Sequence, residues 1–243
     1  MTVPIFRRGD LRHGVPTLPV LVLHLTVLAP ISLTAHEIIT TKLTWTEHIS
    51  RIFQRRCVGC HQPDGIAPFP FTTYEQVRPW AKAIKYEVLN RRMPPWDAVK
   101  GFGAFRNDMG LSQEEIAVIS SWVEGGAPEG ESLYLPEGQI SGKPYREEPT
   151  PPDTKAVQIR GVTVVRDAIK AIGLFPGALD EAASLEITAR KPDGSVTPLL
   201  WLRDYHPRWK RTYYFREAID LPPGTRVEVY PESAAATLVI ANP

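Results

Sequence analysis

Apolar residues recur at helical spacing between residues 43 and 133. Three such stripes predict three helices that share one core: Ile49, Ile52, Phe53 and Cys57 in the first, Val77, Trp80, Ala81, Ile84 and Val88 in the second, and Ile116, Ile119, Trp122 and Val123 in the third. Each stripe follows a pattern typical of a capping box, in which a hydroxyl and a side chain three residues later satisfy the first helical amides. These pairs are Thr44 with Glu47, Thr73 with Gln76, and Ser112 with Glu115.

After about residue 155 the pattern changes to short runs rich in β-branched and aromatic residues, which predict strands. The runs are 156–165, 168–174, 185–190, 196–202, 211–218, 226–230 and 237–240. Pro192-Asp193-Gly194 and Pro222-Pro223-Gly224 separate neighbouring runs and predict tight turns. Short strands joined by such turns favour an antiparallel sandwich. Residues 136–152, rich in Pro, Gly, Glu and Ser and without periodicity, are typical of a linker.

The first 35 residues have the pattern of an export signal. Basic residues precede an apolar run at 15–35, and small residues at 32–35 offer a cleavage site before His36. An uncleaved anchor is the alternative, because about 20 apolar residues can span a bilayer. Prolines and a histidine within the run weaken a permanent membrane helix and favour cleavage. Both interpretations place the rest of the chain outside the cytoplasm.

Composition and charge narrow the class of protein. The chain has 243 residues, 43% hydrophobic and 23% charged, and a net charge of +1. These values indicate a globular protein with room for two modest cores. They give no electrostatic case for nucleic-acid binding, and no basic run or recognition motif supplies one locally.

Both cysteines lie in one motif, Cys57-Val58-Gly59-Cys60-His61. This is CxxCH, the attachment signature of c-type haem, in which the thiols form thioethers with the haem vinyl groups and the imidazole binds iron. A redox-active dithiol, a zinc site and a structural disulfide are the alternatives. A dithiol motif normally opens a helix after a strand, whereas this pair ends a helical stripe. Zinc would need two further ligands at short spacing, and the chain has no other cysteine. The motif therefore favours one covalent haem c.

A six-coordinate haem needs a second axial ligand, and a thioether there raises the reduction potential relative to a second imidazole. Met93 is the expected ligand, because the two prolines that follow it end the second helix and hold an extended loop. The same side chain could instead fill a gap in a core. Met109 and His48 are the reserve candidates.

Other motifs accompany CxxCH at residues 45–49, 65–69, 92–96, 107–108 and 111–131. With them, residues 43–131 resemble the haem domain of a bacterial cytochrome c family. In that family the haem domain is often fused to a β-domain similar to the C-terminal half of the copper type II, ascorbate-dependent monooxygenases. Three later segments are similar to that β-domain: 191–194, 200–205 and 221–226.

The resemblance and the two patterns together predict a multidomain chain, with an N-terminal all-α, class I-like cytochrome c domain followed by an all-β antiparallel sandwich. The expected parts are a signal peptide or anchor (1–35), a cytochrome c domain (36–135), a Pro-rich linker (136–155) and a monooxygenase-like β-domain (156–243).

The β-domain departs from its copper-bearing relatives, which have a His-x-His pair and a Met as copper ligands. The corresponding residues here, 173–180, include no histidine, and the C-terminal half has no Met or Cys. His206 is its single histidine, and one imidazole cannot build a copper site. We therefore expect a β-domain without copper, and a surface or hairpin position for His206.

The expected function is electron transfer by an exported mono-haem cytochrome, with the iron coordinated by His61 and Met93. No catalytic residue is expected, and the pattern favours a carrier over an enzyme. Two alternatives stay open. One is a haem subunit or domain that donates electrons to a copper-dependent, monooxygenase-like oxidoreductase. The other is a haem module of a larger assembly in which the β-domain docks.

The expected location is periplasmic or otherwise extracytoplasmic, with membrane association if the N-terminus is uncleaved. The expected partner is a redox protein. Basic residues gather in the expected haem region, where they would steer an acidic partner, pair with the haem propionates, or simply form a solvated helix face. They are Arg51, Arg55, Arg56, Lys82, Lys85, Arg91 and Arg92.

Overall fold

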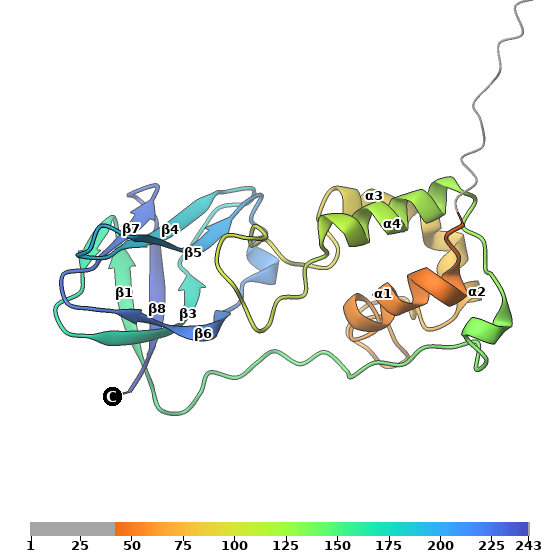
Figure 1. Ribbon diagram of the computed structural model, residues 1–243, viewed down its shortest axis with the longest axis horizontal. Coiled ribbons are helices and arrows are strands. Elements are labelled where there is room, and N and C mark those ends of the chain that lie inside the picture. The colour runs from red at the N-terminus through yellow and green to blue at the C-terminus, as the bar shows by residue number, and fades with distance from the viewer. Residues whose placement is uncertain (1–41, 243) are drawn as a thin grey trace, which may run out of the picture. The chain divides into compact units, whose positions relative to one another are not determined.

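The computed structural model of the chain describes residues 42–242 (Figure 1). The predicted leader at 1–35 lies outside the described residues. Between residues 42 and 242, no helix is long and apolar enough to cross a membrane.

Short helices follow the predicted stripes. A π-helical turn, η1 (Trp45–Ile49), continues directly into α1 (Ser50–Arg56). A second helical stretch consists of α2 (Tyr74–Val77), the 3₁₀ turn η2 (Arg78–Trp80) and α3 (Ala81–Leu89). The longest helix of the described part is α4 (Gln113–Glu124), and two further 3₁₀ turns are η3 (Ser132–Tyr134) and η4 (Pro207–Trp209).

Two of the three predicted capping boxes are confirmed. The Ser112 hydroxyl accepts a hydrogen bond from the Glu115 amide at 3.0 Å, and the Glu115 carboxylate accepts one from the Ser112 amide at 2.9 Å. Thr73 and Gln76 form the same reciprocal pair at the start of α2. At the first helix Thr44 accepts a hydrogen bond from the Glu47 amide, but the described part contains no return bond from the Glu47 side chain.

The three stripes contribute to one apolar core, with one exception. Trp80 was expected on the inner face of the second helix but is 40% exposed, and its ring lies 4.3 Å from that of Phe69. Residues 78–80 form a 3₁₀ turn, which has three residues per turn instead of 3.6 and so changes the direction in which side chains point. The stripe is interrupted where Trp80 occurs.

From residue 154 on, the chain forms two four-stranded antiparallel sheets, with strand orders β1-β8-β3-β6 and β2-β7-β4-β5. The strands are β1 (Thr154–Arg160), β2 (Val162–Val164), β3 (Ile169–Pro176), β4 (Leu185–Arg190), β5 (Val196–Leu202), β6 (Tyr213–Leu221), β7 (Arg226–Tyr230) and β8 (Ala235–Ala241). The predicted run at 156–165 forms two strands instead of one. It divides at Gly161, whose φ of +51° is a backbone conformation that glycine adopts readily, so β1 and β2 enter different sheets.

Residues 96–107, which we call the edge segment, pair with one outer strand of each sheet. Ala98 forms an antiparallel bridge with Leu202 of β5, and Phe105 forms one with Phe215 of β6. In the two strand orders, β5 and β6 are terminal strands. Three side chains of the segment are buried in the core of the sandwich: Trp96, Ala98 and Phe105.

The expected fold class is therefore wrong. The described residues before β1 contain only short helices separated by long irregular stretches, and an all-α domain is not what they form. Prolines at 79, 94 and 95 limit helix length, since proline cannot donate the backbone hydrogen bond of a helix interior. Apolar residues of the edge segment are buried against strands instead of helices.

Residues 136–152, expected to be a linker, make specific contacts. Ile140 is buried in the core of the helical region, and its amide donates to the Thr72 carbonyl at 2.8 Å. The Tyr145 amide donates to the Gly59 carbonyl at 2.7 Å. The division of the chain into a haem domain, a linker and a β-domain stays a prediction.

Replacing Leu174 by Ala should destabilise the protein by about 2–5 kcal/mol, because this fully buried β3 side chain would leave a cavity in the sandwich. Urea denaturation measures the effect. Lys170→Ala, on the same strand with its side chain 68% exposed, should stay within about 0.5 kcal/mol of wild type. Equal losses in both variants would contradict the described core.

Candidate functional site

The CxxCH motif forms a tight turn at the end of α1. The Cys57 amide still donates to the Phe53 carbonyl at 2.8 Å, as in a helix. The amides of Cys60 and His61 both donate back to the Cys57 carbonyl, at 3.1 and 2.9 Å. The turn thus brings both thiols and the imidazole into one short stretch of backbone.

The loop that follows the motif returns to it. The Ala67 amide donates to the Cys60 carbonyl at 3.2 Å, and the Phe71 amide donates to the His61 carbonyl at 2.9 Å. Gly65 lies so close to the Cys60 carbonyl oxygen that a Cβ atom there would collide with backbone. Residue 65 must be glycine for the loop to close in this way.

The His61 ring has one nitrogen engaged and one free to bind a metal. Its Nδ1 lies 2.8 Å from the carbonyl oxygen of Phe69. A carbonyl can only accept, so Nδ1 carries the proton and Nε2 keeps its lone pair, the arrangement that second-shell partners impose on metal-binding histidines. The Phe71 ring stacks on the imidazole at a centroid distance of 4.4 Å. Burial lowers the pKa of His61, although the bond to Phe69 acts in the opposite sense, and this favours the neutral form that binds metals.

The two thiols are free and weakly acidic. Burial, with a smaller contribution from the nearby Glu115 carboxylate, raises the pKa of Cys57 to about 12, and burial also raises the pKa of Cys60. A redox-active dithiol needs a thiol with a lowered pKa, so these surroundings disfavour that alternative. In the part of the chain that the structure describes, no three His, Cys, Asp or Glu residues gather in a way that could hold zinc.

The surroundings of the motif fit a porphyrin. Ile66 and Phe69, in the loop after His61, are exposed apolar side chains, and Phe69 packs on the exposed Trp80 ring. Apolar side chains of this kind match the faces of a flat, mostly apolar ring, and an imidazole with a free Nε2 matches its iron. The donor set and the apolar surface are therefore compatible with haem attached to Cys57 and Cys60.

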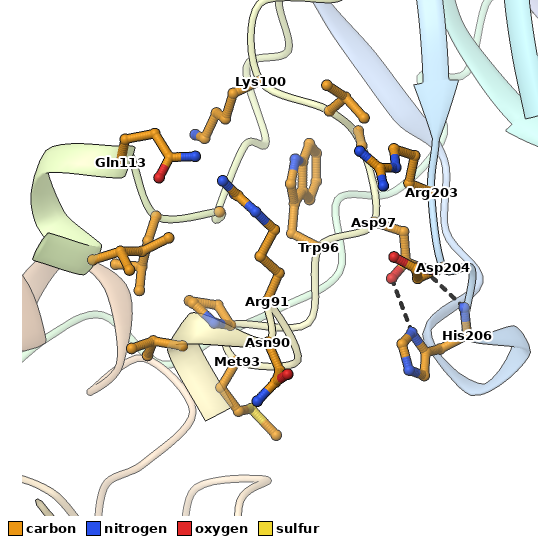
Figure 2. Close-up of a pocket in the computed structure, with 17 residues that line it drawn as sticks. Asn90, Arg91, Met93, Trp96, Asp97, Lys100, Gln113, Arg203, Asp204 and His206 are labelled. Carbon is orange, nitrogen blue, oxygen red and sulfur yellow. Dashed lines mark hydrogen bonds and ion pairs between the residues drawn. The ribbon is translucent and has the colours of Figure 1, made fainter. Parts of the chain in front are cut away.

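Met93 borders a pocket of about 410 Å³ that Trp96 and Asp97 also line (Figure 2). The lining of this pocket does not include Cys57, Cys60 or His61. The structure thus holds three of the four predicted haem-binding residues in one turn and places the fourth, Met93, in the loop after α3. Met93 is 38% exposed, and its sulfur has no partner among residues 42–242.

The two reserve ligands are engaged elsewhere. The Sδ atom of Met109 lies 2.8 Å from a guanidinium nitrogen of Arg211, and its side chain packs against the core of the sandwich. The His48 Nδ1 accepts a hydrogen bond from the Thr44 amide at 3.4 Å, at the start of its own helix. Both observations favour Met93 over the reserves.

Most of the basic residues expected to face a partner are paired within the protein. Arg55 and Arg56 contact Glu115, Lys85 contacts Glu124, and Arg92 contacts Glu87 through two hydrogen bonds of 2.9 Å. Lys82 and Arg91 have no ion pair in the described part. The paired residues leave less free positive charge than the sequence suggested.

His206 differs from its expected surface position. Its side chain is only 18% exposed, and its Nδ1 lies 3.2 Å from the carboxylate of Asp97, an edge-segment residue (Figure 2). The His206 amide also contacts that carboxylate at 3.3 Å. A lone histidine between two strands gives no sequence signal of a partner so far away in the chain.

Two further residues near the motif were not predicted. Tyr145, from the supposed linker, hydrogen-bonds the Gly59 carbonyl through its amide. Arg211, from the segment before β6, lies close enough to Cys60 for its positive charge to oppose the rise in the thiol pKa. Both approach the motif through tertiary contacts, and no spacing in the sequence indicates them.

Comparison with known proteins adds no assignment: no protein-family model matches the chain, and no curated protein matches it.

Replacing Glu115 by Gln should loosen the helix that carries the motif. Burial would raise the pKa of Glu115, but hydrogen bonds from the Ser112 amide and Arg56, with the charges of Arg56 and Arg55, hold it below its usual value. The carboxylate therefore stabilises the fold above about pH 4.5, and this contribution is lost as the pH falls through the lowered pKa.

We expect Glu115→Gln to lower the free energy of unfolding by roughly 1.5–3 kcal/mol at pH 7, the range for hydrogen bonds to a charged group. The difference in the free energy of unfolding between variant and wild type should become smaller at acid pH. Urea denaturation at a series of pH values measures it. If this difference stays constant down to pH values at which carboxylates are protonated, the role given to the Glu115 charge is contradicted.

Proposed function

We propose that this chain is an exported, mono-haem c-type cytochrome that transfers electrons, in which Cys57 and Cys60 would hold haem c and His61 and Met93 would coordinate its iron. The observation that carries the proposal is the His61 ring in the CxxCH turn. Its Nδ1 is committed to the Phe69 carbonyl at 2.8 Å, which leaves Nε2 as a free ligand beside the two thiols.

Haem, when bound, supplies an iron that accepts and releases one electron. The residues of the chain orient and shield it. Phe69 and Phe71 fix the rotation of the imidazole, one through its carbonyl and the other through its ring. Cys57 is half-buried, and a low-polarity environment is one of the means by which a protein sets a reduction potential.

Met93 is the proposed sixth ligand because its sulfur is available and its rivals are not. Two prolines follow it, and each restricts φ, so the loop has few conformations to lose when the sulfur binds. A thioether ligand favours reduced iron, which suits a carrier that accepts electrons at a high potential.

Haem attachment tests the proposal directly. Full-length chain, exported in a bacterium with a cytochrome c maturation system, should yield red protein whose haem stays with the polypeptide after denaturation in acid and organic solvent. Cys57→Ser/Cys60→Ser should lose this covalent haem, because serine cannot form a thioether. Wild-type protein that stays colourless under these conditions would contradict the proposed function.

The sixth ligand has its own test. Oxidised wild-type protein should show the weak far-red absorption band of sulfur bound to ferric haem, and Met93→Ala should abolish it. Met109→Leu is the matched control and should keep the band, since the Met109 sulfur contacts Arg211 instead. Survival of the band in Met93→Ala would show that another residue is the ligand.

A further inference from the structure

The edge segment pairs with both sheets, and the proposed function does not account for this pairing. On the β5 side, the Val99 amide donates to the Trp201 carbonyl at 2.8 Å, and the Arg203 amide donates to the Asp97 carbonyl at 3.1 Å. These bonds continue the antiparallel pattern of the sheet across its outer strand.

The β6 side has an equivalent set of contacts. The Arg106 amide donates to the Tyr214 carbonyl at 2.9 Å, and the Arg216 amide donates to the Ala104 carbonyl at 2.8 Å. The Asn107 side chain extends this pairing, because its amide nitrogen donates to the Thr212 carbonyl at 2.8 Å and its oxygen accepts from the Tyr214 amide at 3.2 Å.

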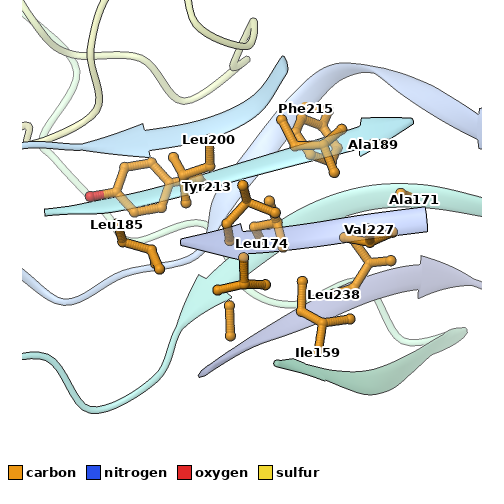
Figure 3. Packing of buried hydrophobic residues seen from close by; sticks show 14 of the residues in the cluster. Ile159, Ala171, Leu174, Leu185, Ala189, Leu200, Tyr213, Phe215, Val227 and Leu238 are labelled. Atoms are coloured by element: carbon orange, nitrogen blue, oxygen red, sulfur yellow. The ribbon is translucent and has the colours of Figure 1, made fainter. Parts of the chain in front are cut away.

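Aromatic side chains anchor the segment between these two edges. Figure 3 shows Tyr213 and Phe215 of β6 among the core residues of the sandwich. The Trp96 ring lies 5.0 Å from that of Tyr213, and the Phe105 ring lies 5.8 Å from that of Phe215. The rings of Trp96 and Phe105 are buried, so the segment is held by the hydrophobic core as well as by hydrogen bonds.

Met93 is close in sequence to Trp96, the first buried aromatic residue of the edge segment. Only Pro94 and Pro95 separate it from Trp96, and three residues of extended chain reach at most about 10 Å. On its other side the Met93 amide donates to the Glu87 carbonyl of α3 at 3.4 Å. The Met93 loop therefore spans a short distance between a helix and the sandwich.

We infer that the β-sandwich positions the sixth haem ligand: by holding the edge segment at β5 and β6, it keeps Met93 on the iron. This inference rests on the proposed function. It assigns a role to a β-domain that lacks a copper site, and it makes Asn107 and the backbone of Val99 positioning groups that do not touch the iron. Protection of exposed sheet edges is the competing explanation of the same contacts.

Replacing the bound methionine by imidazole from solution separates the two explanations. At saturating imidazole, the rate at which ferric protein binds it is limited by the release of Met93. Asn107→Ala removes two hydrogen bonds on the β6 side, and Val99→Pro removes one on the β5 side. Each should raise the limiting rate about fivefold or more, the factor that corresponds to the net contribution of one hydrogen bond.

Ile159→Val is the matched control. Ile159 is buried in β1, which is the opposite edge of the sheet from β6, so this variant weakens the sandwich without touching the edge segment. Its limiting rate should equal that of wild type. Amide hydrogen exchange gives a second readout, because the amides of Val99 and Arg106 should exchange faster in Asn107→Ala than in Ile159→Val.

The outcomes are distinct. Wild-type protein without covalent haem would overturn the proposed function and this inference with it. Haem-bearing wild type whose imidazole rate is unchanged in Asn107→Ala and Val99→Pro would overturn the inference alone, and it would assign the edge segment to edge protection. Equal acceleration in Ile159→Val would also overturn the inference, since general loosening of the sandwich would then suffice.

Discussion

Backbone hydrogen bonds between the edge segment and the outer strands β5 and β6 join the two chemically different parts of this chain. An outer strand presents unpaired amides and carbonyls, and a sheet with two open edges is prone to pair with other chains. In this protein a stretch that precedes the sandwich in sequence satisfies one edge of each sheet. Trp96 and Phe105 of that stretch are buried with the strands, so the sandwich core includes a residue only three positions after Met93.

The CxxCH motif, in contrast, is held by contacts between residues that are close in the sequence. The end of α1, the turn from Cys57 to His61 and the returning loop are connected by backbone hydrogen bonds over a short stretch of sequence. Within that stretch the Phe69 carbonyl orients the imidazole, and Cys57 is half-buried. Among the described residues after β1, Arg211 contacts the Met109 sulfur, and Arg203, Asp204 and His206 line the same pocket as Met93.

Ion pairs within the protein reduce its free positive charge below what the number of arginines and lysines around the CxxCH motif suggests. Acidic residues on α3 and α4 form ion pairs with Arg55, Arg56, Lys85 and Arg92, which reduces the free positive charge near these helices. The only histidine after the motif, His206, is likewise engaged by the Asp97 carboxylate. Through this contact and its backbone amide, His206 helps to hold the edge segment.

The sequence by itself determined the features that depend on neighbouring residues. Periodicity and capping chemistry located α4 and the α2–α3 stretch, turn residues located the hairpin between β4 and β5, and CxxCH located the turn that carries the thiols and His61. The fold class was wrong because the burial of Trp96 and Phe105 depends on strands more than a hundred residues later, and no local pattern records such a contact. The exposure of Trp80, the pairing of His206 and the approach of Arg211 were also decided only in the tertiary structure. Packing and long-range hydrogen bonding select among conformations that the local sequence permits equally.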